Sequence, residues 1–101
     1  MKIVIVGASG TIGAAVSELL AQDHQVIRVG HSQGDARVDM RDPASIRALF
    51  EQIGSFDALV VASGSVAFNA LTEMTDEQWQ VGLQSKLMGQ INLTRAAIPH
   101  L

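Results

Sequence analysis

Three glycines at three-residue intervals constrain the fold of this chain more than any other feature. Gly7, Gly10 and Gly13 follow an apolar, β-branched run at residues 3–6 and lead into residues 11–22, where apolar positions recur at helical spacing. A short, wholly apolar run is typical of a strand that is buried on both faces of a parallel sheet. The start of the chain therefore predicts a strand, a tight glycine turn and a helix.

Strand and helix signals alternate along the next part of the chain. Residues 26–29 predict a second strand, and a turn-rich segment separates it from a short third strand at residues 37–40. Parallel neighbours usually need a longer crossover, so this connection has lost its helix or the third strand is only a stub. Asp42 before a proline predicts a helix start, Gly54 ends that helix, and residues 57–61 predict a further apolar strand.

The last predicted element is a long helix over residues 76–98. Thr75 and Gln78 have capping-box spacing at its start, and Pro99 helps to stop it. We expect a buried apolar stripe along it, formed by Leu83, Leu87, Ile91 and Ile98. The order of elements predicts one α/β domain over residues 1–101: a Rossmann-type, doubly wound parallel sheet in a three-layer α/β/α arrangement.

Composition excludes several classes of function. The chain has 101 residues, room for one domain, and 48% of them are apolar against 17% charged, which suits a packed core. A net charge of -3 provides no basic surface for nucleic acid and disfavours acidic membrane surfaces. The absence of cysteine fits a reducing compartment, and we expect a cytoplasmic protein. The histidines are scattered, so we expect no metal site.

The glycine turn has the residue types that a dinucleotide diphosphate requires. Glycine permits the tight turn, backbone without a Cβ lets the anion approach, and free amides at a helix N-terminus face the negative charge. Hydroxyl groups in the turn can add donors. The alternative is a glycine-rich turn that holds no ligand. We favour the binding interpretation, with these candidate cofactor contacts: Gly7, Ser9, Gly10, Thr11, Ile12 and Gly13.

No carboxylate follows the second strand, where an acidic residue would hold an adenosine ribose and favour NAD. Gly30, His31 and Ser32 stand there instead. A 2′-phosphate is therefore not repelled, and NADP is the expected cofactor, with NAD as the alternative. His31 and Ser32 are the candidate phosphate contacts, with Arg28 and Arg37 as further candidates. Imidazole is a weaker phosphate partner than arginine, and its binding depends on pH; the alternative is that His31 is a solvated turn residue.

Asp39 and Met40 end the predicted third strand, at the edge where an adenine would lie in this topology. A carboxylate there can accept a hydrogen bond from the adenine amino group. An aspartate that merely forms a turn is an equally good explanation. Both residues are candidate cofactor contacts.

With these motifs in place, the chain resembles the short-chain dehydrogenase/reductase family over its whole length. VGASGTIG is similar to the glycine motif of the family, VDMRD to its adenine motif, LVVASG to its strand-ending Asn-Ala-Gly motif, and WQVGLQSKLMGQINLTRAAIPHL to its long interface helix. The resemblance implies a doubly wound fold, an NAD(P)(H) cofactor and hydride transfer to or from a carbonyl or alcohol of a small-molecule substrate. It also implies homo-oligomers that form through the helix at residues 76–98.

The resemblance assigns further residues after the strand at residues 57–61. Ala62, Ser63 and Gly64 occupy the Asn-Ala-Gly positions and become candidate cofactor contacts, although only Gly64 keeps the residue of the family. Lys86 stands at the position of the family's catalytic asparagine, and it is the candidate catalytic residue. A lysine cannot supply that amide. It is either a cation that takes part in proton transfer or a side chain that extends to solvent along apolar surface.

The chain has no tyrosine, so it does not contain the Tyr-x-x-x-Lys proton donor that follows the long helix in this family. We therefore expect the cofactor half of an NADP-preferring oxidoreductase. Two alternatives stay open. One is a nucleotide-binding or redox-sensing protein that has lost the reaction, and the other is an extended-type epimerase or dehydratase, which the GxxGxxG spacing permits.

Two features indicate surfaces that need further packing. The strand at residues 57–61 would be a bare sheet edge. Gly82 and Gly89, seven residues apart on one helix face, indicate a close approach of another segment. That segment is the same helix of a second subunit or a part of this chain's own fold.

Overall fold

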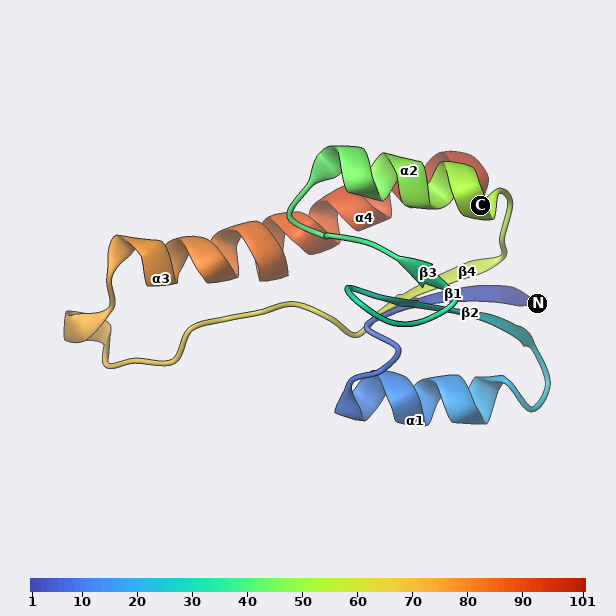
Figure 1. The fold of residues 1–101 in the computed structure, drawn as a ribbon, viewed down its shortest axis with the longest axis horizontal. Coiled ribbons are helices and arrows are strands. Elements are labelled where there is room, and N and C mark those ends of the chain that lie inside the picture. The colour runs from blue at the N-terminus through green and yellow to red at the C-terminus, as the bar shows by residue number, and fades with distance from the viewer.

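The computed structural model describes residues 1–101 and has three layers (Figure 1). The central sheet has four parallel strands in the order β3-β2-β1-β4, namely β1 (Lys2–Val6), β2 (Gln25–Gly30), β3 (Ala36–Arg37) and β4 (Ala58–Val61). One face is covered by α1 (Thr11–Leu20), and the other by α2 (Pro43–Ile53) and α4 (Gln90–Ala97). The predicted doubly wound parallel sheet with helices on both faces is confirmed.

Strand β1 lies between β2 and β4 in the middle of the sheet, and it is buried on both faces because helices pack on each of them. Val4 and Val6 belong to the larger apolar core, which the sheet shares with α2 and α4. Ile3 and Ile5 point to the opposite face, where Leu20 of α1 packs against them. The wholly apolar strand of the sequence therefore serves two cores at once, as its composition predicts.

Strand β3 is shorter than predicted. It covers Ala36–Arg37 rather than residues 37–40, and it pairs with β2 after a connection that contains no helix. The chain then leaves the sheet, because the N–H of Asp39 donates to the Ser45 side chain of α2, at 2.9 Å, instead of to a neighbouring strand. The interpretation of this strand as a stub is confirmed.

The helix starts predicted from capping residues are confirmed. The Asp42 side chain accepts a hydrogen bond from the Ala44 N–H at the start of α2, and Gly54 closes that helix with a φ of 75°. Thr75 and Gln78 form a capping box at the start of α3 (Asp76–Val81). Short-range hydrogen bonds decide these boundaries, which is why they can be read from adjacent residues.

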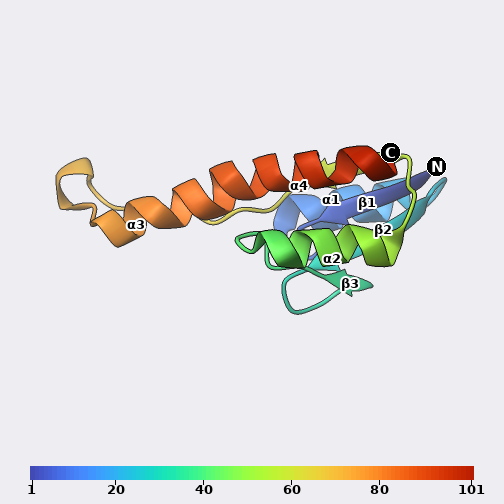
Figure 2. The same cartoon turned by 90° about the horizontal axis from the view of Figure 1, so that it is seen from above.

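The long helix is continuous but not α-helical throughout (Figure 2). After α3 come a π-helical stretch over Gly82–Gly89, then α4, and finally a 3-10 turn over Ile98–His100 that contains Pro99. The α-helical part therefore ends at Ala97, one residue before the predicted end. π-Helical segments inside α-helices are rare and occur frequently at functional sites.

The face of this helix that is buried differs from the predicted one. The expected stripe of Leu83, Leu87, Ile91 and Ile98 is between 39% and 62% exposed. The residues that turn inward are instead spaced four apart and are mostly small, namely Ser85, Gly89, Leu93 and Ala97. The prediction was wrong because the pattern of apolar residues along a helix does not show which face another segment of the chain packs against.

The approaching segment is part of the same chain. A Cβ added to Gly89 would lie 2.8 Å from Met40 Cε and 3.0 Å from the Met40 carbonyl oxygen, closer than packed atoms lie. The nearest atom to a Cβ on Gly82 would be Val66 Cγ1, at 3.5 Å. Both glycines thus face the chain's own fold, which is the second of the two alternatives above.

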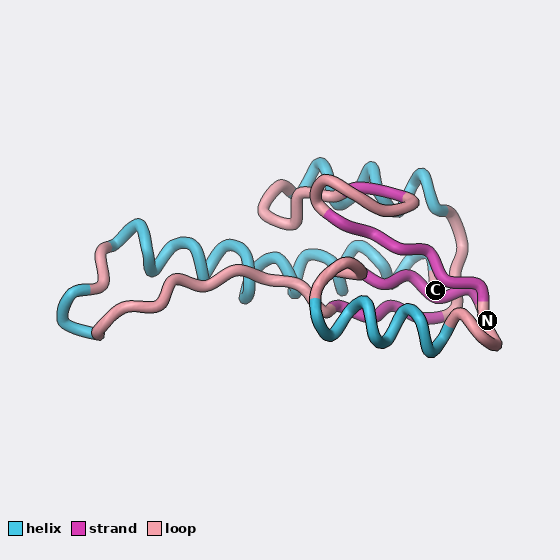
Figure 3. The backbone as a smooth tube through the Cα atoms, turned by 60° about the horizontal axis from the view of Figure 1, so that its bottom comes forward, coloured by secondary structure: helices cyan, strands magenta, loops and turns pink.

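Two parts of the molecule present surface that no other part of the chain covers. Strand β4 pairs only with β1, so its outer edge is open, as predicted. Residues 65–83, which we call the arm, run away from the sheet as a loop and a returning helix that lie side by side (Figure 3). The arm makes the molecule 47 Å long against 27 and 20 Å in the other directions. No helix of the molecule has the length and apolar character needed to cross a membrane.

Candidate functional site

A hollow of about 550 Å³ lies at the carboxyl ends of the strands. All four strand exits contribute to its wall, because parallel strands end at the same edge of a sheet. In doubly wound sheets, ligands bind at this edge where the strand order reverses, and here the reversal lies between β1 and β4. The hollow brings together nine predicted contacts, namely Gly7, Ser9, Gly10, His31, Asp39, Met40, Ala62, Ser63 and Gly64.

The other predicted site residues do not line this hollow. Ser32 lies in the exposed turn after β2, and Lys86 lies on the long helix. Thr11, Ile12 and Gly13 form the first turn of α1, where the Ile12 side chain is 71% exposed. The backbone amides of that turn are available to a ligand. The first amides of a helix have no partner within the helix, and no side chain caps them here.

The glycines of the loop after β1 have different reasons to be glycine. Gly7 has a φ of 86°, and a Cβ there would lie 2.6 Å from the Ala62 carbonyl oxygen. A Cβ on Gly13 would collide with the Gly7 carbonyl oxygen. Both are required by the fold alone.

Gly10 is not required by the fold. Its φ of -73° suits any residue, and a Cβ there would meet only the Gly7 carbonyl oxygen, at 3.5 Å. The missing side chain instead keeps the hollow open beside the N-terminus of α1. A cradle that a Cβ would fill, next to uncapped helix amides, fits a diphosphate.

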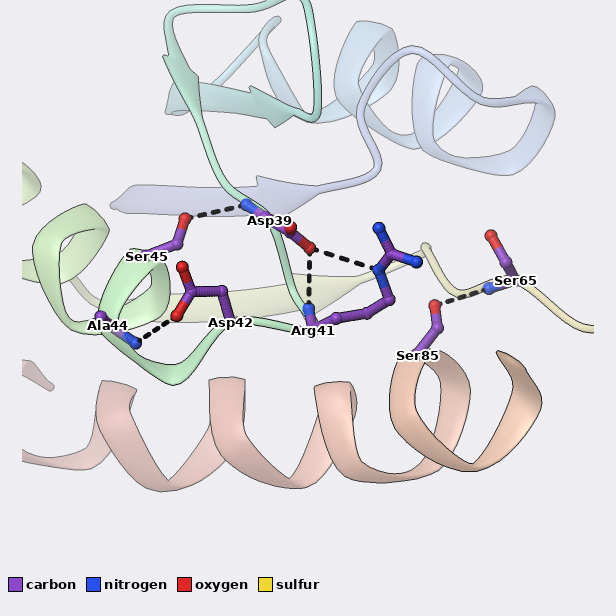
Figure 4. Close-up of polar contacts among 7 residues, drawn as sticks. All are labelled: Asp39, Arg41, Asp42, Ala44, Ser45, Ser65 and Ser85. Atoms are coloured by element: carbon purple, nitrogen blue, oxygen red, sulfur yellow. Dashed lines mark hydrogen bonds and ion pairs between the residues drawn. The ribbon is translucent and has the colours of Figure 1, made fainter. Parts of the chain in front are cut away.

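Asp39 is held in place by Arg41, the second residue after it. Asp39 Oδ1 accepts a hydrogen bond from the Arg41 backbone N–H at 3.0 Å and lies 3.5 Å from Arg41 Nε (Figure 4). The backbone hydrogen bond and the charge of Arg41 hold the pKa of the Asp39 carboxyl below its ordinary value of 3.8, although partial burial acts in the opposite direction. Asp39 is therefore an ionised hydrogen-bond acceptor on the wall of the hollow at neutral pH.

The exit of β4 is fastened to the long helix. Ser85 Oγ, which is buried, accepts a hydrogen bond from the Ser65 N–H at 2.9 Å (Figure 4), and Gln90 Nε2 donates to the Ser63 carbonyl oxygen at 3.3 Å. Between them Gly64 has a φ of 139°, and a Cβ there would lie 3.2 Å from Lys86 Cα. The helix thus braces the segment that contains Ala62, Ser63 and Gly64.

Arg41 and Ser85 also line the hollow, and neither was predicted to be a site residue. A signal for Arg41 was present, because it lies directly after Asp39 and Met40 and before the helix cap at Asp42. A charged residue between a strand end and a helix start in this fold lies at the binding edge of the sheet. Nothing local distinguishes Ser85, which is placed by the packing of the helix.

A second hollow of about 490 Å³ lies between the arm's loop and its helix, and its wall is mostly apolar. Lys86 lines this second hollow rather than the first, and its side chain is exposed. Trp79 shares the second hollow with Val66 and Ala67 of the loop after Gly64. No three histidine, aspartate or glutamate side chains of the chain gather in a group that could hold a metal ion.

Comparison with known proteins identifies related sequences over the whole chain. The sequence model of the short chain dehydrogenase family matches residues 1–101. An uncharacterized NAD-dependent oxidoreductase of Mycobacterium tuberculosis is 34% identical over 99 residues, which cover 93% of this chain and 36% of that protein. The 3-oxoacyl-acyl-carrier-protein reductase FabG of Escherichia coli is 30% identical over 113 residues, which cover 93% of this chain and 46% of FabG.

Solved structures share the fold. The protein lin1944 from Listeria innocua superposes with a TM-score of 0.97 at 48% identity, over 100% of this chain and 50% of that one. A small-chain dehydrogenase in complex with NADPH has a TM-score of 0.90 at 23% identity, over 100% of this chain and 46% of that one, and shows likeness of fold. The chain spans half or less of the length of these proteins.

Proposed function

Because the chain belongs to the short-chain dehydrogenase family, we propose that it is the cofactor half of an NADP(H)-preferring oxidoreductase. The reaction is hydride transfer between the cofactor and a carbonyl or alcohol of a small molecule. One observation carries the proposal: the hollow combines the cradle at Gly10 with the ionised carboxylate of Asp39. The description of the curated relatives as oxidoreductases supports it.

The residues of this chain bind and orient the cofactor. The amides of the first turn of α1 face the diphosphate, and the helix dipole adds about 0.3 to 1 kcal/mol for each favourable charge. The free oxygen of the Asp39 carboxylate accepts a hydrogen bond from the adenine amino group. The bound nicotinamide ring supplies the hydride chemistry.

The preference for NADP(H) rests on the end of β2. Gly30 and His31 line the hollow there, and neither carries a carboxylate that would repel a 2′-phosphate. NAD(H) is the competing cofactor, since one curated relative is described as NAD-dependent. A direct comparison of the two dinucleotides decides between them.

The exposed face of the long helix is the proposed contact with a second copy of the chain. Leu83, Leu87 and Ile91 present apolar side chains along it, and contiguous exposed apolar surface of this kind marks an interaction site. Twofold pairing of one helix with its copy buries the same residues on both sides. Coverage by another part of the same polypeptide is the outcome that would contradict this pairing.

The cofactor proposal is tested by titrating NADPH and NADH into the protein in its natural full-length context, followed by nicotinamide fluorescence. We expect saturable binding with NADPH the tighter ligand. Gly10→Ala should weaken binding about tenfold, because the methyl group enters the cradle, with little change in melting temperature.

The matched control is Gly82→Ala, whose Cβ also has its nearest neighbour at 3.5 Å but lies outside the cofactor hollow. It should leave dinucleotide binding unchanged. Absence of binding by the wild type, or an undiminished affinity in Gly10→Ala, would count against the proposal.

A further inference from the structure

We propose that Arg41 selects the 2′-phosphorylated dinucleotide: its guanidinium holds Asp39 with one edge and binds the 2′-phosphate with the other. This inference rests on the proposed cofactor function and names the residue on which its NADP(H) preference depends. The argument starts from which basic side chains the fold brings to the hollow.

Four basic side chains lie on β2 and β3 or shortly after them, and two of the four line the hollow. Arg28 and Arg37 do not line the hollow, whereas His31 and Arg41 do. Among the lining side chains, Arg41 alone carries a permanent positive charge. Its planar fork of N–H donors matches phosphate oxygens two at a time, which an imidazole ring cannot do.

The contacts of Arg41 leave most of its donors free. Nε lies against Asp39 Oδ1 at 3.5 Å, and the two terminal amino groups make no hydrogen bond within the chain. Figure 4 marks contacts to the Asp39 carboxylate from Nε and from the backbone N–H of Arg41, and none from these amino groups. The Arg41 side chain is 58% exposed, so turning toward an anion requires little desolvation and breaks no packing.

The pairing also resolves a conflict of charge in the hollow. Asp39 is the one acidic side chain on its wall, and an unpaired carboxylate would repel a 2′-phosphate, which adds roughly two negative charges. Arg41 compensates the carboxylate at 3.5 Å. A site with both residues can accept the adenine amino group and the phosphate at the same time.

The test measures the dissociation constants of NADPH and NADH in the natural full-length context. The proteins compared are the wild type, Arg41→Met, Arg41→Lys and Arg37→Met. Arg41→Met should weaken NADPH about 10- to 100-fold, the worth of a charge-assisted phosphate contact, and NADH less than about threefold. Arg41→Lys keeps the charge without the fork and should fall between wild type and Arg41→Met.

Arg37→Met is the matched control, because it removes the same charge from an exposed arginine that does not line the hollow. It should change both constants less than about threefold. Equal losses of NADPH and NADH in Arg41→Met would overturn the inference while leaving the cofactor function intact. A wild type that binds neither dinucleotide would instead overturn the proposed function.

Discussion

The body of the molecule and its arm differ in how far they bury large apolar side chains. In the body, which comprises the sheet with α1, α2 and α4, Phe50 and Leu93 are completely buried. In the arm, Phe68 is 92% exposed and Leu71 is 76% exposed. The body completes its own core, whereas the arm is held by its capping box and by its continuity with α4. Local hydrogen bonds can therefore shape a segment that buries little apolar surface of its own.

The candidate site lies where these two regions meet. The glycine loop, the end of β2 and Asp39 belong to the body, while Ser65 comes from the arm and Ser85 from the helix just behind it. The side of the hollow that these residues form thus depends on the well-packed region. The opposite wall depends on a hydrogen bond between two serines at the base of the arm.

The sharpest test of this contrast compares two phenylalanines. Phe50→Ala should lower the free energy of unfolding by about 3 to 5 kcal/mol, because it leaves a cavity beside Phe56 and His100, which stack on the ring. Phe68→Ala should change it by less than about 0.5 kcal/mol. Chemical denaturation of both variants measures the difference. Similar losses would mean that the arm is packed as tightly as the body.

A second test concerns what covers the exposed face of the long helix. Leu87→Lys should weaken self-association by about 1 to 2 kcal/mol, roughly tenfold, because it places a charge in the proposed contact. Leu19→Lys makes the same change on the exposed side of α1 and should leave association unchanged. Sedimentation equilibrium measures both. If neither variant shifts the equilibrium, the second copy does not bind to this face.

The smallest expected effect is the pH dependence that Asp39 contributes. Because its pKa is lower in the folded chain than 3.8, ionised Asp39 stabilises the fold above about pH 4, and this contribution disappears as the pH falls below that value. Asp39→Asn should therefore be slightly less stable than wild type at pH 7, with a smaller difference at pH 3. Melting temperatures at both pH values test the sign. A difference that grows toward pH 3 would contradict it.

Several features of the fold were predictable because they depend on neighbours in sequence. The caps at Asp42 and Thr75 need only an acceptor side chain and the next few amides. The strand, glycine loop and helix at the N-terminus follow from an apolar run and a residue without a Cβ. Most site residues were also predictable, since the strand ends of a parallel sheet share one edge.

Other features depend on how one element of the fold packs against the next. The length of β3 was misjudged because Asp39 bonds to Ser45 of the following helix, a competition that strand propensity does not express. Lys86 was placed by resemblance at a catalytic position, but the turn of the helix directs its side chain to the second hollow.

The sequence by itself determined the order of strands and helices, their caps and the glycine cradle, because each depends on contacts within a few residues. Only the tertiary structure decided which face of the long helix is buried and which arginine reaches the hollow. Met40 lies so close to Gly89 that the helix must turn its small residues inward and its leucines outward. Such steric fit depends on the shapes of two surfaces at once, which neither segment encodes alone.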